Sequence, residues 1–401
     1  MQVSPIDVNQ FDDIRPFNDE ELVGALGRLT KEPLFYKMMK WVYPDLNKAA
    51  IQAMMKEIKS ISQFQQEFCG PVFKVIAQKT TSGLTFSNME LLEHGKPHLF
   101  LSNHRDIILD SALLNVSLLE KGYSTTQIAI GDNLLKTPFV RDLVRANKNF
   151  IVNRNINAKE MFFYSLRLSN YIRKTITEDR DSIWIAHREG RSKDGDDRTA
   201  SGLLKMFTLS SNKSIEDGFL DLNIVPMCVS YEYDPCDILK ANELVQSRLF
   251  GSYDKKPGED FMSMMRGLTG HKGRVNISVG NSFARVIEEM RFIQHKNEKI
   301  LHLANAVDNE MHRIYKLWPN NFIAYDMLHG SKEYRDQYNN IQKIAFSNYI
   351  RGNVIRLGLQ RRKLGLPREG FNKNVRDVLL EMYANPVVNK KKVTSQAGQL
   401  A

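Results

Sequence analysis

The spacing of apolar positions divides the chain into three stretches with different predicted structure. Between residues 18 and 79 apolar residues recur every three or four positions, as in "KAAIQAMMKEIKSI", which predicts amphipathic helices. Asn18 is placed to cap the first of these helices. From about residue 84 the pattern changes to short, nearly continuous apolar runs. After Gly280 helical spacing returns, over 284–318, over 332–364 and near 373–384.

The short apolar runs in the middle stretch predict strands. They are "GLTF", "HLFLSN", "QIAIGD", "NFIVNR", "SIWIAHREG", "NIVPMCVSYEY" and "GRVNISVG". Helical patterns at 109–120, 138–146, 158–178 and 199–211 separate several of the runs. This alternation predicts an α/β fold with a mostly parallel central sheet flanked by helices, preceded by an N-terminal helical segment and followed by a C-terminal helical extension.

These changes of pattern also predict the domain organisation. We expect an N-terminal helical region at 1–83, an α/β domain at 84–283, a C-terminal helical region at 284–388 and a disordered tail at 389–401.

Composition and charge narrow the class of protein. The chain has 401 residues, of which 42% are hydrophobic and 25% are charged, as in globular proteins. A net charge of +10 favours an anionic partner, such as nucleic acid, acidic lipid or a phosphorylated substrate. The cysteines, Cys69, Cys228 and Cys236, match neither a disulfide framework nor a metal-binding spacing. We find no signal peptide and no run of eighteen apolar residues, so we expect a cytoplasmic protein that is soluble or lies on a membrane surface.

Polar residues that follow strand ends line the ligand-binding crevice of parallel α/β sheets, so they are the first candidates for a site. Asn103 and His104 follow the run "HLFL", and a predicted helix carries Asp110 soon afterwards, with Asp106 in the turn between. A histidine held by a carboxylate can act as general base toward a substrate hydroxyl. The spacing alone leaves open a structural histidine that caps the helix, and either aspartate as its partner.

Two further stretches carry candidates for binding an anion. In "RDLVRANKNFIVNR" Arg154 ends a strand and Arg145 precedes it, and the guanidinium fork suits phosphate. A solvated basic face is the alternative there. The stretch "REGRS" follows another strand, and a glycine between charged residues favours a small anion-binding turn, with a charged loop as the alternative. Its candidate residues are Glu189, Gly190, Arg191 and Ser192.

A fourth stretch, "NIVPMCVSYEYDP", has Pro226 inside an apolar run. Proline removes a ladder donor, which indicates a bulge, a pocket wall or an edge strand. His94, His98 and His104 are close in sequence, but they fit no usual metal-ligand template, so we predict no metal site.

In this order and spacing, the four stretches resemble the four sequence blocks of the glycerolipid acyltransferase family, which includes glycerol-3-phosphate and 1-acylglycerol-3-phosphate acyltransferases. The resemblance covers about residues 84–283. The family's first block is N-H-x4-D, which implies that His104 is the general base toward a glycerol hydroxyl. Asp110, with one residue inserted, is the favoured partner, and Asp106 is the alternative.

The remaining blocks imply how the acceptor is held. The resemblance implies that the acceptor phosphate is bound through Arg154, Arg191, Arg145, Glu189, Gly190 and Ser192. It implies that Asn103 and Pro226 shape the pocket. The sequence departs from the family in two further places, because "EGRS" lacks the residue between Gly and Arg, and Lys148 stands where the family usually has Gly.

The resemblance implies an enzyme that moves a fatty acyl group from a CoA or acyl carrier protein thioester to a glycerol hydroxyl. The acceptor would be glycerol-3-phosphate or a lysophospholipid such as 1-acylglycerol-3-phosphate, in phospholipid synthesis, and no cofactor is needed. A lipid substrate implies a peripheral protein at the inner face of the membrane. Residues 33–43, "PLFYKMMKWVY", are our candidate contact with an anionic membrane surface, with a core-packing helix as the alternative.

The alternative function is that of a non-catalytic protein that binds anionic lipid or nucleic acid. No nucleic-acid-binding motif is present in the sequence, so we expect no nucleic acid as partner.

Overall fold

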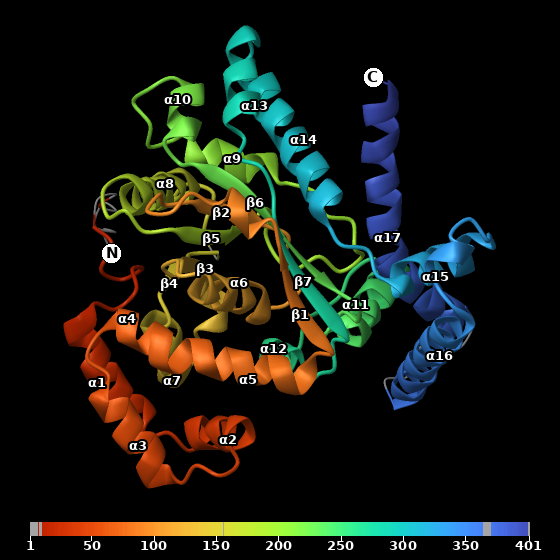
Figure 1. The fold of residues 1–401 in the computed structure, drawn as a ribbon, viewed down its shortest axis with the longest axis horizontal. Helices are drawn as coiled ribbons and strands as arrows, with labels where there is room; N and C mark the ends of the chain where they lie inside the picture. The colour runs from red at the N-terminus through yellow and green to blue at the C-terminus, as the bar shows by residue number, and fades with distance from the viewer. Residues whose placement is uncertain (1–6, 8–9, 155, 364–369, 400–401) are drawn as a thin grey trace.

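The computed structural model describes residues 7, 10–154, 156–363 and 370–399. Its centre is a seven-stranded sheet with the strand order β1-β7-β6-β2-β5-β3-β4 (Figure 1). Neighbouring strands are parallel except β6 and β7, which are antiparallel. The predicted α/β fold with a mostly parallel sheet is confirmed, and the β6–β7 pair is its antiparallel part.

Each of the predicted apolar runs forms one strand of this sheet. The strands are β1 (Gly83–Ser87), β2 (Leu99–Ser102), β3 (Gln127–Gly131), β4 (Asn149–Val152), β5 (Ile183–Ala186), β6 (Ile224–Tyr231) and β7 (Arg274–Val279). Every residue of β2 and of β6 is buried. Such strands have apolar neighbours on both faces, which is why their sequences are continuous rather than alternating.

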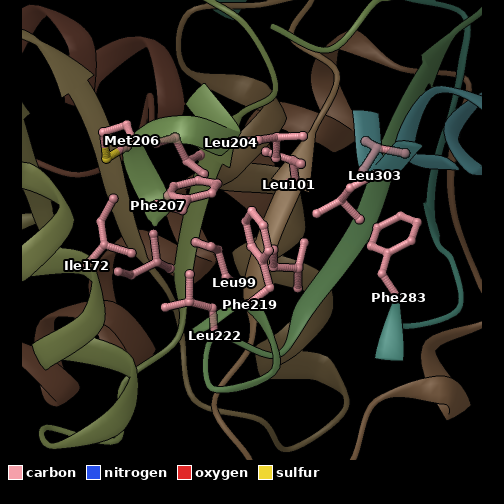
Figure 2. Packing of buried hydrophobic residues seen from close by; sticks show 14 of the residues in the cluster. Leu99, Leu101, Ile172, Leu204, Met206, Phe207, Phe219, Leu222, Phe283 and Leu303 are labelled. Atoms are coloured by element: carbon pink, nitrogen blue, oxygen red, sulfur yellow. The ribbon is translucent and has the colours of Figure 1, made fainter. Parts of the chain in front are cut away.

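Helices cover both faces of the sheet, and alternate residues of a strand pack against different faces. Leu99 and Leu101 of β2 pack with Ile172, Phe207 and Leu303 on one face (Figure 2). On the other face Phe100 and Trp184 pack with helices α5 and α6. The helices around the sheet are α5 (Gly70–Thr80), α6 (Leu109–Glu120), α7 (Pro138–Ala146), α8 (Met161–Thr177), α9 (Ser201–Phe207), α10 (Ile215–Leu220), α13 (Ala284–Glu289) and α14 (Lys296–Ile314).

The N-terminal helices form a separate apolar cluster beside the sheet. They are α1 (Asp19–Leu29), α2 (Pro33–Val42), α3 (Lys48–Glu57) and α4 (Ile61–Gln63), followed by a π-helical turn at Phe64–Cys69. Asn18 caps α1 and shares a capping box with Glu21, as its side-chain type favours. In α2, Phe35 and Met39 are buried in the cluster while Trp41 is 38% exposed. The helix therefore packs its apolar face against the protein, which favours the core-packing interpretation of residues 33–43.

Between β6 and β7 the chain forms two helices that the sequence pattern did not single out, α11 (Asp237–Phe250) and α12 (Glu259–Thr269). The C-terminal region then adds α15 (Pro319–His329), α16 (Asn340–Lys363) and α17 (Phe371–Gln399). Together with α11 these helices bury a cluster of their own. The domain boundaries near residues 83, 283 and 388 stay a prediction.

The predicted disordered tail is wrong for residues 389–399, because α17 continues through them. Asn389 is buried, and Lys390 Nζ donates a hydrogen bond to the Tyr315 carbonyl oxygen at 2.9 Å. These tertiary contacts hold a polar sequence in a helix. Residues 400–401 lie outside the described residues.

Candidate active site

Hydrogen bonds and an ion pair join the four predicted stretches at the carboxyl end of the parallel strands. The Ser192 N–H donates to the His104 carbonyl oxygen at 2.7 Å, which joins the third stretch to the first. Arg154 Nη1 lies 3.5 Å from Glu189 Oε1, which joins the second stretch to the third. The Val229 N–H donates to Asn103 Oδ1 at 2.8 Å, which joins the fourth stretch to the first. Segments far apart in sequence thus form one site.

The His104 ring is held by Asp110. Its Nδ1 lies 2.8 Å from Asp110 Oδ2, and that oxygen also accepts the backbone N–H groups of Arg105 at 2.6 Å and Asp106 at 2.9 Å. The Tyr231 hydroxyl donates to Asp110 Oδ1 at 2.9 Å. The Asp110 side chain is 1% exposed and the His104 side chain 15% exposed. The described residues offer no hydrogen-bond partner to His104 Nε2, which is therefore available to a substrate.

Asp106 occupies the other position that the sequence left open. Its Oδ1 accepts the backbone N–H groups of Ile108 at 2.9 Å and Leu109 at 2.8 Å, so it caps the start of α6. Burial, with the neighbouring Asp110 charge, raises the pKa of Asp106. Asp110 is therefore the carboxylate that contacts the histidine, and Asp106 is a helix cap.

The turn after β5 presents the third stretch to the site. Gly190 has φ +72°, in the left-handed region that favours glycine. Ser192 is buried, Glu189 is largely exposed, and Arg191 has an intermediate exposure. Arg191 Nη1 is buried without a hydrogen-bond partner among the described residues. A buried guanidinium nitrogen of this kind suits an anionic ligand.

Arg154 and Arg145 have different surroundings, although both belong to the second stretch. Arg154 follows β4, and its side chain is 34% exposed beside Glu189. Arg145 instead donates to the carbonyl oxygens of Arg15 at 3.0 Å and Asp12 at 2.8 Å, and its guanidinium lies 4.4 Å from the Phe17 ring centroid. The structure brings Arg154 to the other stretches, whereas Arg145 holds the N-terminal segment.

The departure at Lys148 also has a structural reason. Lys148 has φ +57°, the conformation in which a glycine is free of strain. Its Nζ bonds to Asp181 Oδ1 at 2.9 Å and to the Thr125 carbonyl oxygen at 3.0 Å. The lysine therefore keeps the glycine conformation and fixes it with side-chain contacts.

Pro226 lies in an interior strand, so the edge-strand interpretation is wrong. Residue Leu101 of β2 pairs with Pro226 on one side, and the β7 ladder on the other side begins at Met227. The Pro226 carbonyl oxygen accepts the Gly280 N–H at 2.9 Å, just past the end of β7. The position where Pro226 lacks an N–H faces β7, beyond the end of the antiparallel ladder, so the proline removes no hydrogen bond from that ladder.

Buried ion pairs beneath the site were not predicted from the sequence. Arg105 Nη2 lies 2.5 Å from Asp197 Oδ2, and both side chains are buried. Burial raises the pKa of Asp197, but the Arg105 charge outweighs this effect and keeps that pKa below its usual value. Lys240 Nζ, 2.6 Å from Asp234 Oδ2, donates to the Arg105 carbonyl oxygen at 2.8 Å. Asp197 is 92 positions from Arg105, and Lys240 is 135 positions from the carbonyl that it contacts, so no local signal in the sequence pointed to these two contacts.

His187 is a second buried histidine near these pairs. Burial lowers its pKa to about 4, so it is neutral at physiological pH. Its Nδ1 lies 3.3 Å from the Thr199 hydroxyl. It is not in a position for proton transfer to a solvent-accessible substrate, because its side chain is buried.

Residues 83–230 match the family model described as Acyltransferase. This range of the chain is therefore similar to the acyltransferase family. The matched range begins with β1 and ends within β6, so it contains the first three stretches, most of the fourth, and the contacts that join them.

Among solved structures, the chain is similar to the crystal structure of the 1-acyl-sn-glycerophosphate (LPA) acyltransferase PlsC from Thermotoga maritima. The sequence identity is 10%, the match covers 72% of this chain and 94% of that chain, and the TM-score is 0.33. No curated protein matches the chain. The similarity to the acyltransferase family therefore rests on residues 83–230.

The described residues contain no group of three or more His, Cys, Asp and Glu side chains suited to a metal ion. In the same part of the chain, no helix has the length and hydropathy needed to span a bilayer. The three cysteines are buried thiols without disulfides.

Proposed function

We propose that the enzyme transfers a fatty acyl group from a thioester of CoA or acyl carrier protein to a glycerol hydroxyl of a phosphorylated acceptor. The acceptor class is glycerol-3-phosphate or a lysophospholipid such as 1-acylglycerol-3-phosphate. The observation that carries the proposal is the His104–Asp110 pair, whose Nδ1–Oδ2 distance is 2.8 Å and whose second ring nitrogen is available. The family match supports the reaction class.

In this mechanism His104 Nε2 accepts the proton of the acceptor hydroxyl as the oxygen attacks the thioester carbonyl carbon. Asp110 holds Nδ1–H and stabilises the positive charge that develops on the ring. The tetrahedral intermediate collapses by breaking the carbon–sulfur bond, and the imidazolium returns the proton to the departing thiolate. The products are an ester and a free thiol, so atoms and charge balance without an added cofactor.

The acceptor phosphate would be held by arginines of the second and third stretches. Arg191 offers the buried, unpartnered Nη1, and Arg154 is partly exposed next to Glu189, two positions before Arg191. Two guanidinium groups on one phosphate fix the position of the hydroxyl relative to His104, and such positioning contributes to the rate. Arg145 is not included, because its guanidinium contacts the N-terminal segment.

The test is release of free thiol from acyl-CoA or acyl carrier protein with each acceptor in turn. Loss of a general base lowers turnover by roughly 100- to 10,000-fold, which is the expected effect of His104→Ala. The matched control is His94→Ala, because His94 is exposed and stacks on Tyr123 with ring centroids 4.1 Å apart. Arg191→Gln should mainly raise KM for the phosphorylated acceptor.

Full activity of the His104→Ala variant contradicts the mechanism. If no acceptor supports thiol release while the protein binds anionic vesicles, the non-catalytic alternative is favoured.

A further inference from the structure

The outer face of α16 combines large exposed aliphatic side chains with basic ones. Ile341, Ile344, Ile355 and Leu359 are 79%, 62%, 54% and 55% exposed. Leaving four such side chains in water is unfavourable, by about 25 cal/mol per Å² of apolar surface. Isolated exposed apolar residues need no explanation, but a row of them on one helix does.

These aliphatic residues lie on one side of α16, opposite its buried side, as two pairs with Asn348 and Gly352 between them; we call this set the aliphatic stripe. Phe346, Ile350 and Leu357 face the protein and are at most 2% exposed. At about 100° per residue, this buried row and the exposed aliphatic row lie about half a turn apart. The stripe is therefore a second apolar face, for which the described residues provide no cover.

The charges along α16 all have the same sign. The sequence from Asn340 to Lys363 contains six basic residues and no Asp or Glu. Arg351 and Arg356 are exposed and lie on the two sides of the aliphatic stripe. Neither they nor Lys343 form an ion pair with a described residue. Exposed aliphatic side chains flanked by arginines complement the interface of an anionic bilayer, because anionic headgroups attract the basic side chains.

The buried side of α16 connects to the candidate active site. The Tyr349 hydroxyl donates to Asp237 Oδ2 at 2.6 Å, at the first residue of α11. Lys240, one turn further along α11, donates to the carbonyl oxygen of Arg105, the residue after His104. In Figure 1, α16 lies at the lower right margin of the molecule, beside α15 and α17.

We propose that the outer face of α16 binds the surface of an anionic lipid bilayer. The inference rests on the proposed function, which it deepens by naming the surface through which the enzyme meets a lipid substrate. The aliphatic stripe enters the boundary between headgroups and acyl chains, and Arg351 and Arg356 contact anionic headgroups. This face is distinct from residues 33–43, whose large apolar side chains Phe35 and Met39 are buried.

The experiment measures co-sedimentation of the full chain with vesicles of phosphatidylcholine alone or mixed with phosphatidylglycerol. We expect binding to the mixed vesicles that weakens as salt is raised. Each basic side chain near an anionic surface contributes about a fivefold change in partition, so Arg351→Gln with Arg356→Gln should lower it roughly 25-fold. Ile355→Ser with Leu359→Ser should lower it at least about tenfold.

A matched control removes the same kinds of side chain elsewhere. Leu301 on α14 is 56% exposed, so Leu301→Ser, combined with Arg285→Gln and Lys296→Gln, changes the exposed apolar area and net charge without touching α16. This control should bind vesicles like the unaltered protein. Circular dichroism and thermal unfolding of every variant verify that it folds.

Equal vesicle binding by the α16 variants and the unaltered protein overturns the proposal, and so does binding that depends on Trp41 instead. If light scattering shows that the α16 variants break an oligomer without changing vesicle binding, the stripe is an interface between copies of the chain. His104→Ala should bind vesicles normally. Failure of acyl transfer with intact, α16-dependent binding would therefore refute the proposed function alone.

Discussion

Replacing Asp110 by asparagine isolates the charge that holds His104. The backbone N–H groups of Arg105 and Asp106 both point at the same oxygen as His104 Nδ1. They require an acceptor there, so the asparagine carbonyl oxygen takes that position and its amide group faces the Tyr231 hydroxyl. The ring therefore stays held at Nδ1, and the variant removes mainly the negative charge.

The expected effect on the rate follows from this geometry. Unit charges about 4 Å apart attract by about 4 kcal/mol at an effective dielectric constant of about 20. If the imidazolium forms fully in the transition state, loss of this attraction lowers kcat about 1,000-fold. Asp106→Asn keeps the cap oxygen of α6 and is the matched control, with kcat expected within about threefold.

The assay is thiol release at saturating acceptor, with urea unfolding to check that each variant is folded. Adding Asp110→Asn to the His104→Ala variant should lower kcat little further, because the two residues act as a unit. Nearly normal turnover of Asp110→Asn, together with a large loss in Asp106→Asn, would refute the reasoning and make Asp106 the functional partner.

Three further predictions concern stability. Burial holds the pKa of His187 at about 4, below its ordinary 6.5, so its contribution is present above pH 6.5 and is lost as pH falls toward 4. As pH falls over that range, the unfolding free energy of His187→Gln should therefore decrease by about 3 kcal/mol less than that of the unaltered protein, measured by urea unfolding. Equal pH dependence of the two unfolding free energies would contradict this. Lys148→Gly should be about 1 kcal/mol more stable than Lys148→Ala, since both lose the side-chain contacts but only glycine relieves the positive φ; equal midpoints would show that φ is unstrained. A Cβ added at Gly267 would overlap the Asp106 carboxylate, so Gly267→Ala should lower the unfolding free energy by about 1–3 kcal/mol. Unchanged thermal unfolding of that variant would show that α12 can move away.

Much of the fold follows from local patterns in the sequence. Each buried apolar run formed a strand, and helical spacing placed α6 and α7 at their observed bounds. The antiparallel pairing of β7 with β6 did not follow, because the direction of a strand depends on the connection that precedes it. Here α11 and α12 fill that connection, and no residue within β7 records them.

In the C-terminal tail, local sequence pattern led to a wrong prediction. Polar residues from 389 onward predicted disorder, because their composition offers little apolar surface to bury. In the structure Lys390 reaches the Tyr315 carbonyl oxygen, and α17 packs along α15 and α11. Helix formation there depends on tertiary contacts rather than on local propensity.

For the candidate site, the sequence by itself determined which residue types follow the strands. His104 and Arg154 were singled out because parallel strands present their carboxyl ends at one edge, and Arg191 because a glycine turn that suits an anion follows a strand. Only the tertiary structure decided that Asp110 contacts the histidine, that Asp106 caps α6 and that Arg145 holds the N-terminal segment. The physical reason is that spacing gives the distance along the chain, whereas a hydrogen bond requires direction as well. Tyr231, 121 positions from Asp110, supplies the last bond of that carboxylate, and only folding brings the two together.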